Sequence, residues 1–399
     1  MAYMILGLVG KPNCGKSTFF KASTLMDVEI ANYPFATIEP NRGAGFVRVE
    51  CVCKEFGEQC NPREGYSRDG TRFVPVEIVD VAGIVPGAYE GKGMGNQFLD
   101  DLRQADCLIH VIDTSGSTNE RGEPVDAGSH DPGKDIQFLE DELDMWYLGI
   151  FKRVWERFSR TVLQEKADAV RAIAKQFSGL GVDEDLVKRS LSECSLTSDN
   201  IRDWSDDELK AFVSSLRRAT KPIVIAANKV DTPSGSQNYK RLREEFRHLP
   251  IIGCSAEAEL ALKEAGKHEL IDYMPGNDDF TIIKDMNERQ QKALEFIRSN
   301  VLTPFGSTGV QEILDRCVFD ELKYIALFPG GANNLKDQDG NVIPDCFLMP
   351  SGTTALDFAY RLHTDFGKNF IKAIDVWTKM PVSKDHPLKH RDIIEIMSR

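Results

Sequence analysis

The sequence predicts an α/β fold: a mostly parallel sheet with helices on both faces, a helical insertion and a smaller C-terminal domain. Three observations predict it. Short apolar runs typical of buried parallel strands recur at residues 3–9, 76–80, 107–113, 222–227 and 250–254. Helical stretches such as residues 95–104 lie between them, as in a helix-covered parallel sheet. This alternation stops after residue 113, and the pattern changes again near residue 320.

Three stretches interrupt the strand series. Residues 43–75 carry two weak strand patterns around a loop, which predicts a hairpin. Residues 117–134 are a polar loop. Residues 135–219 have no strand pattern and show long helical periodicity, with a Gly-Leu-Gly break at residues 179–181. Because strands resume at residue 222, we expect residues 135–219 to be a helical insertion within one sheet domain.

The last part of the chain predicts a separate α+β unit. Residues 284–316 have helical periodicity, and strands are expected at 323–328, 345–350, 370–377 and 391–398. A helix is expected at 353–366, with Ser351 or Thr353 as its N-cap. The predicted parts are therefore the sheet domain (1–134 and 220–300), the helical insertion (135–219), a linker helix (301–319) and the C-terminal domain (320–399).

Composition excludes several classes of protein. A chain of 399 residues has room for two or three domains, and 41% apolar residues exclude a wholly disordered chain. No run reaches the ~18 apolar residues of a membrane-spanning helix, so we expect no membrane association. The N-terminal apolar run has no basic segment before it, which argues against a secretory signal. We expect a cytoplasmic protein, with a monomer favoured.

Acidic side chains outnumber basic ones, 62 to 49, for a net charge of −13. The field of such a chain repels phosphate, which excludes a general nucleic-acid coat, and no DNA partner is expected. One stretch, residues 152–175, carries seven basic and three acidic side chains. If it is helical, Arg153, Arg157, Arg160 and Arg171 lie near one face. We favour a solvated helix surface there, and an RNA-contacting stripe is the alternative.

Nine cysteines over this length do not form a disulfide framework, and they indicate a reducing compartment. Cys51, Cys53 and Cys60 are close together in the sequence and could begin a metal site. No C-x-x-C pair is present, and no fourth ligand follows at zinc-finger spacing. The spacing therefore favours reduced loop thiols over a metal site.

A phosphate-binding motif follows the first predicted strand. Residues 10–17, GKPNCGKS, match G-x-x-x-x-G-K-[ST] between a strand and a helix. The glycines let the backbone curl so that successive N–H groups point at the β-phosphate. Lys16 would neutralise charge on the β- and γ-phosphates, and the Ser17 hydroxyl would bind Mg²⁺. This motif alone does not distinguish ATP from GTP.

Three further motifs follow later strands in the expected order. Asp80-Val81-Ala82-Gly83 offers a carboxylate that can hold Mg²⁺ through water and an N–H that can reach a γ-phosphate. In Asn228-Lys229-Val230-Asp231, the Asp231 carboxylate can accept both hydrogen bonds of the guanine N1–H and N2–H₂ edge, a pair of donors that adenine lacks. Asn228 can brace this loop, and the Lys229 stem can pack on the base. In Cys254-Ser255-Ala256-Glu257, the Ala256 N–H could meet the guanine O6.

Together the four motifs describe a P-loop G-domain, with each motif at the carboxyl end of a strand. Residues 32–41 (NYPFATIEPN) and 80–106 (DVAGIVPGAYEGKGMGNQFLDDLRQAD) make the sequence resemble the Obg family of GTPases, in its YchF-type, archaeal-like branch. Residues 347–370 resemble part of a TGS domain, a small β-grasp module. The resemblance spans nearly the whole chain. It implies a ribosome or structured-RNA partner in translation or the stress response, with GTP and GDP as ligands.

The resemblance also assigns roles to single residues. Thr37 would be the switch threonine that closes on Mg²⁺ and the γ-phosphate; Ala36 stands where relatives often have a second threonine. Ile84 occupies the place of a water-orienting glutamine, so slow intrinsic hydrolysis is expected. Asn13 would help to bind K⁺, with a plain polar loop residue as the alternative. His363, Lys368 and Lys372 would face RNA or a nucleotide, although a structural role is more common for such a histidine.

The predicted site therefore has three sets of residues. The catalytic set is Lys16, Thr37 and Gly83, and the metal set is Ser17, Thr37 and Asp80. The nucleotide-binding set is Gly10, Pro12, Asn13, Cys14, Gly15, Lys16, Ser17, Thr18, Asn228, Lys229, Asp231, Ser255, Ala256 and Glu257.

The expected activity is hydrolysis of GTP to GDP and phosphate with Mg²⁺, used as a molecular switch. Two alternatives remain. One is an ATP-hydrolysing YchF-like regulator, disfavoured because the N-K-x-D motif lost in ATP-preferring relatives is complete here. The other is a metabolic enzyme that couples nucleotide hydrolysis to a small molecule, which would need an acceptor pocket that the sequence does not reveal.

Overall fold

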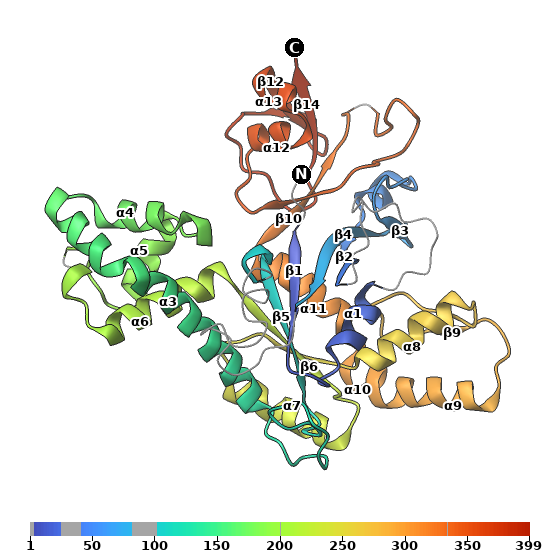
Figure 1. Ribbon diagram of the computed structural model, residues 1–399. Coiled ribbons are helices and arrows are strands. Elements are labelled where there is room, and N and C mark those ends of the chain that lie inside the picture. The colour runs from blue at the N-terminus through green and yellow to red at the C-terminus, as the bar shows by residue number, and fades with distance from the viewer. Residues whose placement is uncertain (1–3, 25–40, 82–101, 200, 333) are drawn as a thin grey trace.

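The structure is a computed structural model, and it describes residues 4–24, 41–81, 102–199, 201–332 and 334–399. Figure 1 shows a central sheet, a group of helices that extends to one side, and a C-terminal domain near the N-terminal end of β1. Thr37, Gly83 and Ile84 lie outside the described residues, as does most of the helix predicted at residues 95–104.

The central sheet confirms the predicted fold class. Its strands are β1 (Ile5–Val9), β2 (Arg42–Glu50), β3 (Tyr66–Arg68), β4 (Thr71–Asp80), β5 (Cys107–Asp113), β6 (Ile223–Asn228) and β7 (Ile251–Cys254). They are ordered β2-β4-β1-β5-β6-β7, with β3 beside β4. All five predicted apolar runs form parallel strands of this sheet. β2 and β3 pair antiparallel with β4, as the predicted hairpin requires.

Each face of the sheet is covered by a separate hydrophobic cluster. Because side chains alternate along a strand, β5 contributes to both: Leu108 and Ile112 to one, Ile109 and Val111 to the other. The first cluster includes side chains of α3 (Gly133–Glu165), α6 (Asp206–Thr220) and α7 (Pro233–Glu245). The second includes side chains of α1 (Lys16–Thr24), α8 (Ala256–Lys267) and α11 (Val310–Asp315). Burial on both faces explains why these strands are continuously apolar.

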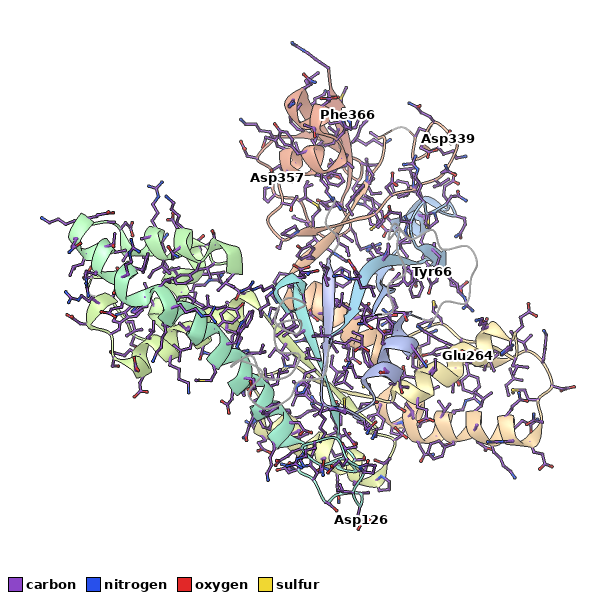
Figure 2. The ribbon with its side chains drawn as sticks, viewed as in Figure 1. Tyr66, Asp126, Glu264, Asp339, Asp357 and Phe366 are labelled. Carbon is purple, nitrogen blue, oxygen red and sulfur yellow. The ribbon has the colours of Figure 1, made fainter. Side chains whose placement is uncertain are left out.

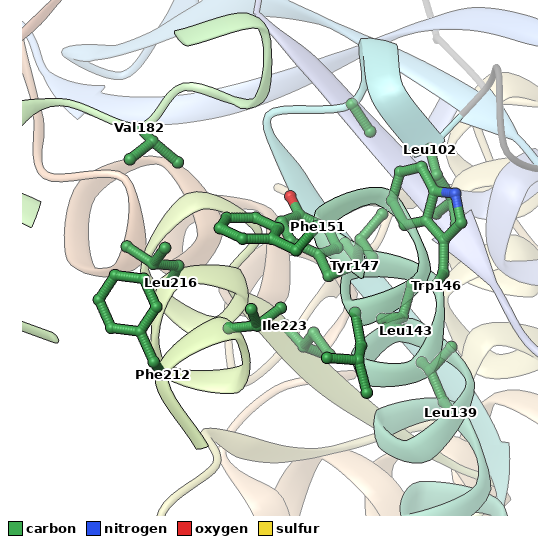
Figure 3. Close-up of a cluster of buried hydrophobic side chains, with 14 of the residues drawn as sticks. Leu102, Leu139, Leu143, Trp146, Tyr147, Phe151, Val182, Phe212, Leu216 and Ile223 are labelled. Atoms are coloured by element: carbon green, nitrogen blue, oxygen red, sulfur yellow. The ribbon is translucent and has the colours of Figure 1, made fainter. Parts of the chain in front are cut away.

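Residues 133–220 fold into helices, as predicted: α3 and α6, with α4 (Ala169–Gln176) and α5 (Glu184–Glu193) between them. Aromatic side chains hold them together. The rings of Phe151 and Phe177 stack, and Phe212 meets Phe151 edge-on. Figure 3 shows Phe151 and Phe212 among the buried side chains of this cluster. Trp146, Tyr147, Phe151 and Trp155 are buried in this core, and Phe158 packs against it.

Residues 256–321 return the chain to the sheet through α8, a short hairpin and a series of helices. The elements are β8 (Ile271–Asp272), β9 (Thr281–Ile282), α9 (Glu288–Ile297), α10 (Thr303–Phe305) and α11, with π-helical turns at Arg298–Leu302 and Arg316–Glu321. Within the described residues, no helix combines the length and the apolar character needed to cross a bilayer.

The C-terminal domain has a mixed sheet and helices over one face. Its elements are β10 (Tyr324–Pro329), β11 (Phe347–Pro350), α12 (Ala355–Leu362), α13 (Thr364–Lys368), β12 (Phe370–Asp375), β13 (Met380–Val382) and β14 (Ile393–Ser398). The strand order is β11-β10-β14-β12-β13, and β10 pairs parallel with β14. Ala355 and Phe358 of α12 pack on Leu327, Ala373 and Ile394 of the sheet. The sequence pattern missed β13, which is only three residues long.

Two details of the predicted C-terminal helix were wrong. Neither Ser351 nor Thr353 is its N-cap, which is Thr354. The Thr354 hydroxyl accepts from the Asp357 N–H, and the Thr354 N–H donates to the Asp357 carboxylate (Asp357 is labelled in Figure 2). Both backbone donors are thereby satisfied. The helix also ends at Leu362, because His363 is extended. The His363 ring accepts from the Asp365 N–H and caps α13, so it has a structural role.

His110 makes stability depend on pH. It lies in β5 between β1 and β6 and is 3% exposed. Burial, with Lys11 nearby, lowers the pKa of His110 to about 3. Between that value and the ordinary pKa of 6.5, the unfolded chain binds a proton that the folded chain does not, so stability falls as pH falls.

Lowering the pH from 7 to 5 should therefore reduce the free energy of unfolding by about 2 kcal/mol through this residue. Urea titrations at both pH values should show that His110→Leu removes this part of the loss, whereas the exposed control His268→Gln keeps it. An equal loss in wild type and His110→Leu would refute the assignment.

Candidate nucleotide-binding site

The four predicted motifs meet at one edge of the central sheet. Residues 10–17 follow β1, Asp80 ends β4, residues 228–231 follow β6, and residues 254–257 follow β7. Because these strands are parallel, their carboxyl ends lie at the same edge, where open α/β sheets bind ligands. Motifs that are far apart in the sequence therefore lie together in a single site.

The P-loop has the backbone geometry that its glycines predict. Gly15 has φ +98°, and a Cβ on it would lie 2.1 Å from the side-chain nitrogen of Asn228. Asn13 is also left-handed, at φ 60°. The Asn228 side-chain nitrogen donates to the Cys14 carbonyl at 3.0 Å. The loop is therefore packed so closely on Asn228 that only glycine fits at position 15.

Lys16 and Asp80, which the sequence assigns to phosphate and Mg²⁺, lie together. The Lys16 ammonium forms an ion pair with the Asp80 carboxylate and donates to the Val81 carbonyl at 2.9 Å. Ser17 stands exposed in the first turn of α1, next to Lys16. A hydroxyl and a carboxylate are hard oxygen donors, the chemistry that Mg²⁺ prefers, so Ser17 and Asp80 fit the ion. Thr18, beside them, is half-buried.

Asn228 joins the P-loop to the last motif. Its side-chain oxygen accepts from the Ala256 N–H at 3.0 Å, the same N–H that was predicted to meet the guanine O6. Ser255 is buried and caps α8 by accepting from the Ala258 N–H, while Glu257 is exposed in the first turn. Residues 254–257 are thus fixed relative to the P-loop through one amide side chain.

Asp231 is placed to meet a ligand. The Val230 N–H donates to the Cys254 carbonyl, and Thr232 caps α7 by accepting from the Gly235 N–H. Asp231 lies between these two fixed residues and is partly exposed. Within the described part of the chain, no side chain hydrogen-bonds or pairs with its carboxylate. This carboxylate keeps its accepting capacity for another molecule.

A buried carboxylate that the sequence analysis missed anchors Lys229. Asp113 ends β5, is fully buried and pairs with the Lys229 ammonium at 2.9 Å. It also accepts from the hydroxyls of Ser115, Ser117 and Thr118. Burial raises the pKa of Asp113, but the Ser115 hydroxyl and Lys229 outweigh this and leave the pKa below its ordinary value. Asp113 therefore stays ionised and holds Lys229 in the base-recognition loop.

The polar loop after β5 lies against the P-loop. Lys11 donates to the Thr118 carbonyl at 2.8 Å and pairs with Asp135 of α3 at 2.8 Å. The Asn13 amide donates to the Gly122 carbonyl at 2.9 Å. Figure 2 shows Asp126 of this loop at the opposite end of the molecule from Phe366 of the C-terminal domain. The P-loop is therefore tied directly to the first turn of the long helix α3.

One signal in the sequence could have revealed the hydrogen bonds of this loop to Asp113. Four hydroxyl residues (Thr114, Ser115, Ser117 and Thr118) follow Asp113 within five positions. Short hydroxyl side chains after an acid at the end of a strand favour local hydrogen bonds to that acid.

The Asp113→Asn substitution should destabilise the protein. It places an NH₂ donor among hydroxyl donors and removes the counter-charge of Lys229. We expect the free energy of unfolding to fall by about 2–4 kcal/mol in urea titrations. Asp126→Asn, an exposed change in the same loop, should cost less than ~0.5 kcal/mol. Similar values for the two variants would contradict the network.

Comparison with known proteins agrees with the geometry. A model described as 50S ribosome-binding GTPase matches residues 5–137. A model of the G4 motif-containing domain of Obg-like, YGR210-like GTPases matches residues 226–331, and the TGS domain matches residues 335–398.

Similar proteins cover the whole chain. An uncharacterized GTP-binding protein of Methanocaldococcus jannaschii is 46% identical over 397 residues, 99% of each chain. A Bacillus subtilis protein named ribosome-binding ATPase YchF is 32% identical over 66% of this chain and 69% of its own. The crystal structure of a GTP binding protein from Pyrococcus horikoshii OT3 is 41% identical, covers 99% of this chain and 100% of its own, and superposes with a TM-score of 0.78. The chain therefore belongs to the YchF-type branch of the Obg-like P-loop GTP-binding proteins that carry a C-terminal TGS domain.

Proposed function

We propose that this protein is a GTPase that hydrolyses GTP to GDP and phosphate and acts as a molecular switch. The observation that carries the choice of GTP is the Asp231 carboxylate, positioned between two fixed residues with no partner in the described part of the chain. Guanine presents two adjacent donors to such a carboxylate, and adenine does not. A relative carries the name ribosome-binding ATPase, so ATP is the competing substrate to test.

The remaining residues take the roles that their positions support. The P-loop backbone would cradle the phosphates, and Lys16 would neutralise charge on the β- and γ-oxygens. Ser17 and Asp80 would hold Mg²⁺, which supplies further positive charge to the phosphates when bound. Thr37 and Gly83 would close on the γ-phosphate. Asn13 would support K⁺ binding through its side-chain oxygen, since its nitrogen is engaged by Gly122.

Asp231→Asn should change nucleotide selectivity. An amide cannot accept both donors of the guanine edge, so GTP affinity should fall by at least tenfold, the equivalent of about 1.4 kcal/mol. Xanthosine triphosphate, whose base has a carbonyl in place of the amino group, should regain part of the lost affinity. Titration calorimetry with GTP, ATP and xanthosine triphosphate measures the three values.

The exposed change Asp207→Asn is the matched control and should leave all three affinities unchanged. A wild-type protein that prefers ATP, or an Asp231→Asn protein with unaltered selectivity, would refute the proposal.

We also propose a ribosome or structured-RNA partner in the cytoplasm. The YchF names of the relatives support it, as does the exposed surface of α3 that carries Arg153, Arg157 and Arg160. Arg171, expected on the same helix face, lies instead on the separate helix α4, because α3 ends at Glu165. Lys11 and Asp135 connect the phosphate loop to α3, so a change at the nucleotide has a direct route to this surface.

Sedimentation with ribosomes should depend on the nucleotide. We expect more protein in the ribosomal pellet with a non-hydrolysable GTP analogue than with GDP, because a ligand shifts a two-state protein only through differential affinity. Arg153→Glu and Arg157→Glu should each reduce binding, while Arg243→Glu on α7 serves as the charge-matched control for either single variant. Equal binding in both nucleotide states would count against the switch, and no binding would remove the ribosome as partner.

A further inference from the structure

Three cysteines converge in the connection between β2 and β3. Cys51 directly follows β2, Cys53 lies in the 3₁₀ turn Val52–Phe56, and Cys60 lies shortly before β3. All three side chains are buried, and their sulfurs lie within 4.8 Å of one another. None forms a disulfide, and the Cys51 and Cys60 sulfurs are 3.3 Å apart. The sequence spacing favoured separate loop thiols, but the fold brings the three sulfurs to one point.

A buried cation lies beside this cluster. Arg72 of β4 is 1% exposed and donates to the carbonyls of Ile343 and Pro344. Among the described residues it forms no ion pair with a carboxylate, and its Nε has no hydrogen-bond partner. Because a buried charge is costly, the guanidinium favours anions nearby. The Asp345 carboxyl interacts electrostatically with Arg72, and thiolates of the cluster beside Arg72 can supply further negative charge.

Ser67 of β3 and Arg72 of β4 both border Cys60. The Ser67 hydroxyl is buried next to Cys60, yet it makes no hydrogen bond of good geometry to the described residues. The Ser67 hydroxyl oxygen is therefore available as a fourth ligand for an ion bound by the cluster.

We propose that Cys51, Cys53 and Cys60 bind a zinc ion, with the Ser67 hydroxyl or a water molecule in the fourth position. Thiolate sulfur is the ligand that zinc prefers in structural sites, and four ligands complete its tetrahedron. Zinc with three thiolates has a net charge of −1, which the Arg72 guanidinium neutralises. The ion thus explains the converging sulfurs, the buried arginine beside them and the unsatisfied hydroxyl together.

The zinc-binding segment also connects the sheet domain to the C-terminal domain. Next to Cys60, the Asn61 N–H donates to the Val342 carbonyl at 2.9 Å, and Arg63 pairs with Asp337 and Asp345. On the other side, Phe56 stacks on Trp377 with ring centroids 5.0 Å apart. Figure 1 shows the β2–β3 connection against the loop that follows β10. The ion would therefore stabilise the surface on which the C-terminal domain docks.

The first experiment measures metal in the full-length protein, purified with a thiol reductant and without chelator. Elemental analysis by inductively coupled plasma mass spectrometry should find about one zinc ion per chain. Cys53→Ser and Cys60→Ser should each lose it, whereas Cys194→Ser, a change in the helical insertion, should retain it. Loss of zinc should also lower the melting temperature, because metal binding is coupled to the folded state.

The second experiment uses cobalt in the wild-type protein, so that it does not depend on a variant that folds poorly. Cobalt should produce thiolate-to-metal charge-transfer bands and the intense visible bands of a tetrahedral site. Competition with a chelator should then show that Ser67→Cys, which supplies a fourth thiolate, binds zinc at least tenfold more tightly than wild type.

Two results would overturn the proposal. One is a wild-type chain that binds neither zinc nor cobalt with thiolate bands. The other is a metal-free protein whose intact mass lacks two hydrogens under non-reducing conditions, which would identify a Cys51–Cys60 disulfide instead.

Discussion

The amide side chain of Asn228 is the interaction on which the nucleotide site depends. It donates to the P-loop at Cys14 and accepts from the Ala256 N–H, while the backbone carbonyl of the same residue accepts from Thr114. One residue thus connects loops that follow β1, β5, β6 and β7. Its tight fit requires glycine at position 15, so the P-loop glycine serves packing as much as phosphate approach. The relative positions of the motifs are set by this contact and not by each loop separately.

A second constraint is the placement of positive charge in a strongly acidic chain. Lys11, Lys16 and Lys229 all lie at the site, and each pairs with a carboxylate from another element: Asp135, Asp80 and Asp113. Half-buried or buried ion pairs hold these ammonium groups in place while the overall charge of the molecule is −13. While paired, each ammonium group is neutralised by its carboxylate, so the ion pairs fix the positions of the lysines without creating a local positive field.

Much of the fold could be predicted from the sequence, because buried parallel strands are continuously apolar and long amphipathic helices have a clear period. The four nucleotide motifs were recognisable since each combines residue type, spacing and strand context. The polar loop after β5 was predicted, but its contacts with Lys11 and Asn13 were not, because they join residues 107 and 109 positions apart and polar loops have no period. Thr354 was missed as the N-cap because Ser351, Thr353 and Thr354 all carry a hydroxyl group, and only the local backbone geometry decides which of them caps the helix. The cysteines converge through a chain reversal that no spacing rule encodes.

The attachment of α3 to the P-loop has a mechanical consequence. This helix has 33 residues, so it is about 50 Å long, and its first turn is the part held by Lys11. Buried side chains along α3, from Ile136 to Val162, pack it into the core shared with β5 and α6, so the helix would move together with that core. A tilt of about 5° at Asp135 would move the far end near Glu165 by about 4 Å, given the 1.5 Å rise per residue. Under the proposed switch, a small rotation at the P-loop end of α3 would therefore become a displacement of several ångströms at the far end of this group of helices.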